Sequence, residues 1–242
     1  MLATPPSLPP QPPAMATIDV FEPASSVRVA RIESRPFGQN TYVLCRPEHA
    51  ACLVVDPGFE PAAIIGWIES MHLRPEAIVV THGHSDHIAG NTALRSHWAE
   101  LPIVIGANDA AKLTDPVANL SAPFGMALVS PPADRLVVDG ESLIVAGFTL
   151  RCRAIPGHSS GHVVFVLEDC VPPVVFGGDV LFREGVGRTD FPDGDFALLA
   201  AGIRRHLYSL PDESLVLPGH GDLTTVGHER RHNPFVPDPK AD

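Results

Sequence analysis

Four side chains that can bind metal ions follow one apolar run within six positions. In the stretch 78–90, IVVTHGHSDHIAG, an apolar run ends and His82, His84, Asp86 and His87 come next. Imidazole and carboxylate groups are the usual protein ligands of zinc, iron and manganese. With 12 histidines in 242 residues, a chance H-x-H-x-D-H is expected in about two such chains in a thousand. The cluster therefore indicates a metal site, with a solvated polar turn as the alternative.

Other apolar runs end in a similar way. Asp56 follows CLVV, His158 follows RCRAIPG, Asp179 follows VVFGG and His220 follows LVLPG. In the last three, glycine stands beside the polar residue, where it permits a tight turn and a close approach of the backbone to a ligand. We therefore expect these strand ends to converge on one shared metal site at a common edge of the sheets.

The number of candidate ligands favours two ions over one. The first ion would be bound by three imidazoles, those of His82, His84 and His158. The second would be bound by Asp86, His87 and His220. Asp179 would bridge them, because a carboxylate has two oxygens and can reach both ions. The first ion would keep a position open for water, as catalytic zinc does, and a hydroxide between the ions would be the nucleophile.

The remaining candidates have weaker signals. His162 begins a predicted strand, and we expect it to be a structural hydrogen-bonding residue rather than a ligand. Asp56 either caps a turn or orients a ligand, and the sequence leaves both open. The other histidines are expected to be solvated, namely His49, His72, His97, His206, His228 and His232.

Short strands rich in Val, Ile and Leu dominate the chain, and helices are fewer. Strands are expected at 27–34, 41–45, 52–55, 77–80, 103–105, 135–138, 142–145, 148–155, 162–167, 174–176 and 214–217. Helices are expected at 60–71, 88–99 and 195–208, with a short one near 108–114. Because the strands of 135–167 follow one another without helices, two mixed sheets with outer helices fit better than a βαβ repeat. Segment 115–134 is predicted to be a long loop that lines a site.

Length and composition predict a single domain over residues 16–242. The chain is 45% hydrophobic and 19% charged, which is enough for one sizeable core. Residues 1–15 are predicted to be a disordered leader, because six prolines in the first thirteen residues prevent a helix or a central strand. The leader lacks the charged and apolar regions of a signal peptide, and either Met1 or Met15 is the start.

Charge and cysteine usage narrow the possible partners. The formal net charge is −11 without a Lys/Arg cluster, which argues against nucleic acid as a binding partner. No apolar stretch approaches the roughly 18–20 residues of a membrane span.

The four cysteines form no C-x-x-C pair and have mostly aliphatic neighbours. They are expected to be buried, reduced thiols of a cytoplasmic protein, with a Cys45–Cys52 disulfide as the alternative. The expected partner is a small-molecule substrate, and the oligomeric state stays open.

The motifs THGHSDH, PGHSSGH, GGD and LPGHG, in this order, resemble the metallo-β-lactamase superfamily over about residues 27–236. The resemblance implies an α/β fold, the αββα sandwich of two mixed β-sheets flanked by helices, with the site at the open edge between the sheets. No cysteine falls at a ligand position, unlike many true β-lactamases, and Asp179 stands there instead. This favours the glyoxalase II-like branch, as do GGDVLFREGVGRTDFPDGD and PGHGDLTTVGHERRHNPF, which resemble small hydroxyacylglutathione hydrolase-like enzymes.

The resemblance implies hydrolysis of a thioester such as a 2-hydroxyacyl-glutathione. The cofactors would be two divalent ions, zinc as the expected occupant and iron or manganese as alternatives, with Asp86 and Asp179 as catalytic residues. The chain ends before the C-terminal helical domain that supplies part of the glutathione site in full-length glyoxalase II proteins. Arg188 in VGRTDF is therefore expected to receive a substrate carboxylate, unless it is a surface residue paired with Asp190 or Asp193.

Two rival functions remain open. GRTDF also occurs in persulfide dioxygenases, which would use one Fe(II) held by His82, His158 and Asp179, a two-histidine, one-carboxylate set suited to O₂ chemistry. A non-catalytic metal-binding scaffold is the other rival. It is disfavoured because a structural site would be closed and would not need a second ion.

Overall fold

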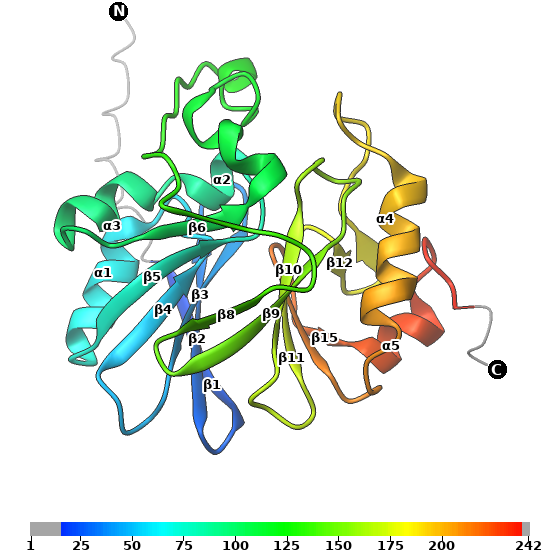
Figure 1. Ribbon diagram of the computed structural model, residues 1–242, viewed down its shortest axis with the longest axis horizontal. Helices are drawn as coiled ribbons and strands as arrows, with labels where there is room; N and C mark the ends of the chain where they lie inside the picture. Colours follow the sequence, from blue (N-terminus) through cyan, green and yellow to red (C-terminus); the bar gives the residue numbers. More distant parts are fainter. Residues whose placement is uncertain (1–15, 239–242) are drawn as a thin grey trace, which may run out of the picture.

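Two β-sheets stacked face to face form the centre of the protein (Figure 1). The computed structural model describes residues 16–238. The predicted leader over residues 1–15, with Met15, lies outside the described residues. The first sheet has seven strands in chain order: β1 (Thr17–Ala24), β2 (Val27–Ser34), β3 (Gln39–Cys45), β4 (Ala51–Val55), β5 (Arg74–Val80), β6 (Ile103–Gly106) and β7 (Arg135–Val137). Its strands are antiparallel from β1 to β4 and parallel from β4 to β7.

The second sheet has six strands in the order β15-β14-β11-β10-β9-β8. They are β8 (Ser142–Val145), β9 (Phe148–Ala154), β10 (Val163–Leu167), β11 (Val174–Gly178), β14 (Leu215–Pro218) and β15 (Thr224–Thr225). Only β11 and β14 pair in parallel. A separate two-stranded ribbon is formed by β12 (Leu181–Phe182) and β13 (Gly185–Val186). Both sheets are therefore mixed, as the sequence predicted.

Helices cover the outer face of each sheet (Figure 1). The first sheet carries α1 (Pro61–Ser70) and α3 (Asn91–His97), with the short α2 (Ser85–Ile88) between them in the chain. The second carries α4 (Phe196–Gly202), which continues as the π-helical turn η3 (Ile203–Leu207), and α5 (Val226–His232). Two 3₁₀ segments, η1 (Ala107–Thr114) and η2 (Ala122–Phe124), lie in the connection between β6 and β7. The layers follow the predicted αββα order.

The apolar run VVFVL of β10 shows why the fold needs this layering. All five residues are buried. Since alternate side chains of a strand point to opposite faces of its sheet, both faces of β10 must be covered. Val163, Phe165 and Leu167 enter the core between the sheets, whereas Val164 and Val166 pack under α4 and η3. A strand buried on both faces reads as a continuous apolar run.

Replacing Phe165 by Ala should lower the free energy of unfolding by about 3–5 kcal/mol, since it removes a fully buried aromatic side chain and leaves a cavity between the sheets. Denaturant unfolding of both proteins measures the change. Phe235→Ala is the matched control, because Phe235 is 55% exposed, and it should change stability by no more than about 0.5 kcal/mol. Equal losses would contradict the placement of Phe165 in the core.

The expected strands are all present, with ends shifted by a few residues. The expected helix over 88–99 is shorter than predicted, since α3 covers residues 91–97 and the unpredicted α2 ends at residue 88. The expected helix over 195–208 changes from α to π after Gly202. Strand β1, the ribbon, β15 and α5 were not predicted. The first four residues of edge strand β1 are all exposed, so the alternation of Ile18 and Val20 with polar residues there marks no buried face.

All four cysteines are free and buried. Cys45 and Cys52 stand directly opposite each other on β3 and β4, but they are not bonded, so the disulfide alternative is wrong. Burial raises the pKa of the Cys52 and Cys152 thiols to about 12, which makes both poor nucleophiles at neutral pH.

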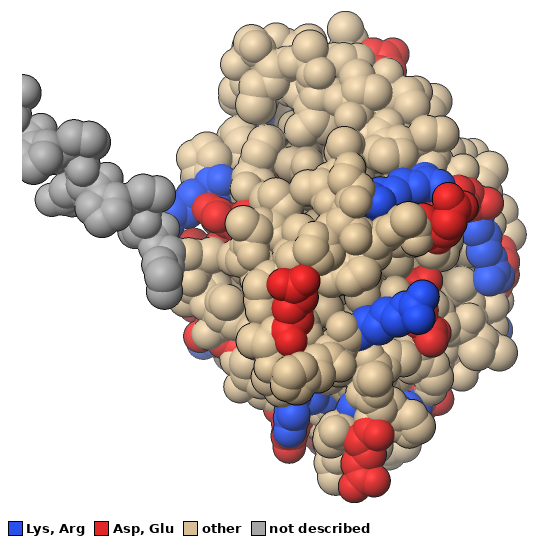
Figure 2. Space-filling model, turned by 90° about the vertical axis from the view of Figure 1, so that its left-hand side faces the viewer, with Lys and Arg blue, Asp and Glu red and all other residues tan. Residues whose placement is uncertain are grey.

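The surface carries interspersed charges. On the face shown in Figure 2, Lys and Arg side chains lie beside Asp and Glu side chains rather than in a basic patch of their own. Ion pairs such as Arg28–Glu22, 2.8 Å, and Arg31–Asp19, 2.5 Å, join β1 to β2. Within residues 16–238, no helix combines the length and apolar character that a membrane crossing requires.

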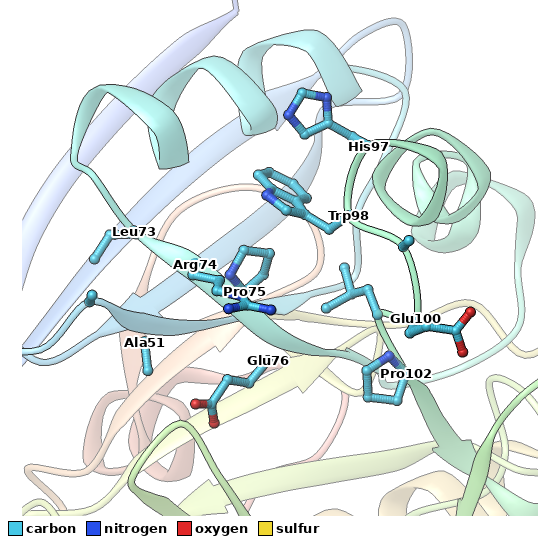
Figure 3. Close-up of a pocket in the computed structure, with 12 residues that line it drawn as sticks. Ala51, Leu73, Arg74, Pro75, Glu76, His97, Trp98, Glu100 and Pro102 are labelled. Atoms are coloured by element: carbon cyan, nitrogen blue, oxygen red, sulfur yellow. The ribbon is translucent and has the colours of Figure 1, made fainter.

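A hollow of about 1000 Å³ lies where β5 begins and α3 ends (Figure 3). Its wall includes Arg74 and Glu76 of β5, together with Trp98 and Glu100 after α3. No group of three metal-binding side chains among the described residues belongs to it. The predicted ligands lie elsewhere, at the opposite end of β5.

Candidate metal centre

The structure brings all seven predicted ligands together at one edge of the two sheets. His82 and His84 follow the end of β5, and Asp86 and His87 lie on α2 directly after them. The second sheet contributes His158 from the loop between β9 and β10, Asp179 from the end of β11, and His220 from the end of β14. The site forms because β4 and β5, and likewise β11 and β14, run parallel, so that their carboxyl ends meet at the same edge.

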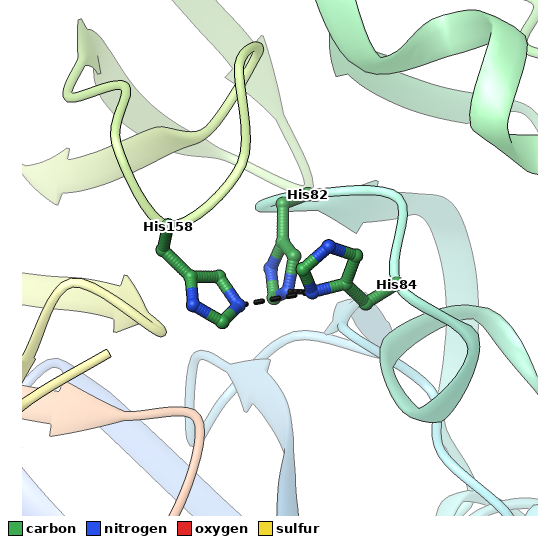
Figure 4. A group of neighbouring side chains, drawn as sticks. All are labelled: His82, His84 and His158. Carbon is green, nitrogen blue, oxygen red and sulfur yellow. Dashed lines mark hydrogen bonds between the residues drawn. The ribbon is translucent and has the colours of Figure 1, made fainter. Parts of the chain in front are cut away.

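Three imidazoles form the first group, which we call the three-histidine half: His82, His84 and His158. Figure 4 shows their rings turned toward one another from two separate loops. The Nδ1 atom of His84 lies 3.1 Å from Nε2 of His82 and 2.9 Å from Nε2 of His158. Such spacing is close to the roughly 3.3 Å expected between ligand atoms of tetrahedral zinc.

Burial keeps these imidazoles neutral. It lowers the pKa of His84 to about 3, with His158 and Lys112 nearby adding to the effect, and it lowers the pKa of His82 and of His158 as well. Neutral imidazoles present lone pairs as well as N–H groups. Three buried nitrogens that face one point therefore fit a bound cation, which would accept all three lone pairs.

A second group consists of Asp86, His87 and His220. Nε2 of His220 lies 3.2 Å from Oδ2 of Asp86, and Nε2 of His87 lies 3.9 Å from the same oxygen. Nε2 of His87 is buried without a hydrogen-bond partner among the described residues. A buried polar atom without a partner is costly, and a cation at this position would satisfy it.

Asp179 lies between the two groups. Its Oδ1 is 3.3 Å from Nε2 of His87, and its Oδ2 is 3.4 Å from Nε2 of His158 and 3.5 Å from Nε2 of His220. Oδ1 is also buried without a hydrogen-bond partner among the described residues. Burial alone would raise the pKa of Asp179, but the nearby His220 and His87 outweigh it and hold that pKa well below the ordinary value. An ionised carboxylate in this place is suited to bridge two cations.

A second layer of groups holds the distal ring nitrogens of the candidate ligand histidines, except Nε2 of His84, which has no hydrogen-bond partner among the described residues. Asp56 accepts hydrogen bonds from Nδ1 of His87 at 2.9 Å and from the backbone N and Oγ1 of Thr81, both at 2.7 Å. Nδ1 of His82 is 3.1 Å from Oγ1 of Thr81. These bonds fix the ring orientations and leave Nε2 of both histidines facing the site. Of the two interpretations of Asp56, orientation of a ligand is the one that the structure supports.

Two backbone carbonyls complete this layer. Nδ1 of His158 donates to the carbonyl oxygen of Arg188 at 2.8 Å, and Nδ1 of His220 donates to that of Phe37 at 3.1 Å. Neither contact was predicted from the sequence, because a backbone acceptor leaves no signature in residue type. Only the fold determines which carbonyl reaches the ring.

His162 agrees with its predicted structural role. Its Nε2 accepts from the backbone N of Asp179 at 3.0 Å, and its ring stacks on that of His82 with centroids 4.6 Å apart. The histidines expected to be solvated are exposed at His49, His72, His97 and His232. His206 and His228 are half-buried instead.

A pocket of about 430 Å³ opens above the ligands. Six apolar side chains line it, namely those of Phe37, Leu120, Phe124, Phe182, Val186 and Phe191. Leu120 and Phe124 come from segment 115–134, which the sequence predicted to line a site. The floor of the pocket is polar, since it includes His84, Asp86 and Asp179. An apolar wall around a few converging polar groups is typical of a small-molecule site.

Arg188 lies at the rim of this pocket. Its Nε and Nη2 donate to the two carboxylate oxygens of Asp190, each at 2.6 Å, and its guanidinium lies 4.5 Å from the centroid of the Phe191 ring. The side chain is 63% exposed. The predicted alternative, a pair with Asp190, is therefore present, while the residue still contributes to the pocket lining.

Comparisons with known proteins agree with this geometry. Residues 34–220 match the family model of the metallo-beta-lactamase superfamily. The hydroxyacylglutathione hydrolase GloC of Haemophilus influenzae is 36% identical over 207 residues, which are 83% of this chain and 93% of that protein. The crystal structure of the BLEG-1 B3 metallo-beta-lactamase is similar with a TM-score of 0.81 and 37% identity, covering 86% of this chain and 99% of that one. That of TTHA1623 in a di-iron-bound form has a TM-score of 0.72 and 35% identity, covering 85% and 98%.

Proposed function

The chain belongs to the metallo-β-lactamase superfamily, and from this premise we propose that it is a dinuclear, metal-dependent hydrolase of thioesters such as 2-hydroxyacyl-glutathiones. The observation that carries the proposal is the placement of Asp179 between two groups of three metal-binding side chains, four of which line one pocket together with Asp179. The similarity to hydroxyacylglutathione hydrolase GloC supports the choice of substrate class.

The three-histidine half would hold one ion, and Asp86, His87 and His220 would hold the other, with Asp179 shared. When bound, the two ions supply Lewis-acid polarisation of the thioester carbonyl and acidify a water. The chain itself keeps Asp179 and Asp86 ionised, since the pKa of each lies below its ordinary value beside neighbouring histidines that outweigh the effect of burial. The phenylalanines of the wall exclude bulk water, which strengthens electrostatic interactions at the floor.

A nucleophile supplied by a cysteine is disfavoured. All four cysteines are buried in the cores, and none lines the pocket.

Arg188→Ala should lower kcat/KM for a glutathione thioester by roughly tenfold or more, about 1.4 kcal/mol, and spare a small neutral thioester. In the described residues Nη1 has no hydrogen-bond partner, while Nε and Nη2 bind Asp190, so the guanidinium can still receive a substrate carboxylate. Steady-state assays on both thioesters measure the change. The alanine variant keeps the backbone carbonyl that holds His158. Equal losses on both thioesters would point to a structural role, and no loss on either would place Arg188 on the solvated surface.

The rival persulfide dioxygenase would need one Fe(II) on His82, His158 and Asp179 only. That assignment gives no metal ion to Nε2 of His87, which is buried without a hydrogen-bond partner among the described residues, and it gives Asp86 and His220 no task. The scaffold alternative is disfavoured by the pocket, because a closed structural site would not open to a small molecule. The similarity to a protein crystallised in a di-iron-bound form supports two ions and keeps iron among the candidates.

Metal content and substrate together test the proposal. Protein purified without chelator should contain close to two transition-metal ions per chain by elemental analysis. It should hydrolyse an acyl-glutathione thioester and consume no oxygen with glutathione persulfide in an oxygen electrode. One iron per chain, unchanged by added zinc and accompanied by oxygen uptake, would favour the dioxygenase instead.

A further inference from the structure

Four polar side chains lie directly behind the three-histidine half, and neither group of candidate ligands includes them. We call them the Asp109 cluster: Asp109, Lys112, Ser159 and Asp193. Asp109 and Lys112 stand on η1, Ser159 follows His158 in the chain, and Asp193 belongs to the loop before α4. Asp109 and Ser159 are fully buried. A buried carboxylate is costly unless it is paired and hydrogen-bonded, so its partners indicate what it does.

The Asp109 carboxylate joins the two chain segments that carry the three imidazoles. Oδ2 accepts a hydrogen bond from the backbone N of Gly83, which stands between His82 and His84, at 2.9 Å. Oδ2 also accepts from Oγ of Ser159 at 2.5 Å, and Oδ1 accepts from the backbone N of Gly161 at 2.7 Å. One side chain of η1 therefore binds the loop after β5 and the loop before β10 at the same time.

Lys112 compensates the charge of this carboxylate. Its Nζ lies 3.2 Å from Oδ1 of Asp109 and donates to Oγ of Ser159 and, at 2.6 Å, to Oδ2 of Asp193. Asp193 in turn accepts from the backbone N of Ser160 at 2.9 Å. The loop that carries His158 is thus held from both sides, by Asp109 in the interior and by Asp193 toward the surface.

The packing leaves this loop no room to shift toward η1. A Cβ atom at Gly161 would lie 2.2 Å from the backbone N of Asp109 and 2.6 Å from its Oδ1. Contacts this short do not occur in folded proteins, so only glycine allows the amide of residue 161 to reach the carboxylate.

We propose that Asp109 is a positioning residue that holds the three-histidine half in its metal-binding geometry. Without a cation, one N–H group on Nδ1 of His84 would have to serve two acceptor nitrogens at 2.9–3.1 Å, which holds the three rings together only weakly. The Asp109 carboxylate compensates for this by fixing the backbones of both segments, and so strengthens metal binding at this half. The inference rests on the proposed function only in that the three-histidine half binds a metal ion, and it is independent of the substrate.

Asp109→Asn tests the proposal. Asparagine keeps the size of the side chain but places an NH₂ group, which cannot accept a hydrogen bond, against one of the backbone N–H donors. The variant is made in two backgrounds, His220→Ala, which disables the second group, and His84→Ala, which disables the three-histidine half. Co²⁺ is titrated into chelator-treated protein and followed by absorption spectroscopy and calorimetry. We expect Asp109→Asn to weaken Co²⁺ binding by about 10–100-fold in the His220→Ala background and by less than about twofold in the His84→Ala background.

Two further variants keep the outcome decisive. Asp134→Asn is the matched control, since Asp134 also accepts from a backbone amide, that of Ile103 at 2.9 Å, and from Arg95 at 2.9 Å. It should lower the melting temperature without changing Co²⁺ affinity. Ser159→Ala takes the place of Asp109→Asn if that variant does not fold. It removes one hydrogen bond to Asp109 and should weaken Co²⁺ binding severalfold.

Equal weakening in both backgrounds, or none in the His220→Ala background, would overturn the positioning role. A wild-type protein that binds only one Co²⁺ would contradict the dinuclear function and not this role, because the His220→Ala background decides the role by itself.

Discussion

Asp179→Asn should lower kcat for thioester hydrolysis by a factor on the order of 10²–10⁴ and weaken the binding of at least one metal ion. The substitution keeps the shape of the side chain and removes its negative charge. Asp179 is the only predicted ligand whose oxygens lie within about 3.5 Å of histidines from both groups, so both ions would lose the charge that separates them. Loss of a preorganised electrostatic group of this kind costs several kcal/mol of transition-state stabilisation.

Elemental analysis and steady-state kinetics on the same preparation measure both effects. Asp222→Asn is the matched control: its side chain is 80% exposed and it stands two residues after His220. It should retain two ions and near-normal kcat. If Asp179→Asn also kept two ions and a near-normal kcat, the assignment of Asp179 as the residue shared by both ions would be wrong.

The convergence of the candidate ligands could be predicted from sequence because two independent signals coincide at each of them. An apolar run marks a strand end, and a metal-binding side chain follows it, as with His158 after RCRAIPG and His220 after LVLPG. The layered fold was predictable for a related reason, since a strand such as β10 buries both faces and reads as one apolar run.

The residues around the ligands could not be predicted, because their roles depend on long-range pairing. Asp56 meets His87 only because β4 and β5 pair in parallel. Asp109 stands in a 3₁₀ turn whose other residues are mostly polar or small, a pattern typical of a solvated surface. The carbonyls of Phe37 and Arg188 carry no information in their side chains. Tertiary contacts, rather than residue type, select these groups.

For Arg188, the sequence predicted the place of the side chain but not its partner. A basic residue close to the ligands in sequence was expected to reach the mouth of the site, and it does line the pocket. The sequence could not decide between a substrate carboxylate and Asp190 as its partner, because both would bind the same guanidinium in the same two-pronged way. In the structure, Asp190 occupies that position.

Gly219→Ala should lower kcat by about 10²-fold or more and reduce metal content, although the change adds only one methyl group. A Cβ atom at this position would lie 2.2 Å from Oδ1 of Asp179 and 2.7 Å from Cε1 of His87. Both contacts are shorter than any that real Cβ atoms make, so the two side chains would have to leave their places in the site. The φ angle of Gly219 lies outside the left-handed region, so the cost comes from contact and not from backbone strain.

The backbone at Gly219 cannot retreat to relieve these contacts. Its N donates to the carbonyl oxygen of Gly178 at 2.8 Å, and its carbonyl oxygen accepts from the backbone N of Asn40 at 2.7 Å. These bonds tie the segment to both sheets, one on each side of the site. The methyl group must therefore displace Asp179 or His87 by a distance approaching about 1 Å, which is enough to misplace the reacting groups.

Gly66→Ala is the matched control for this change. Gly66 stands on the exposed side of α1, and a Cβ atom there would have no neighbouring atom within 4 Å. Alanine at this position should stabilise the helix by about 0.5–1 kcal/mol without affecting kcat. Metal content, kcat and the melting temperature of the metal-free protein are measured for both variants. Full activity of Gly219→Ala with two bound ions would show that Asp179 and His87 tolerate displacement, and the tight placement on which the dinuclear mechanism depends would then be refuted.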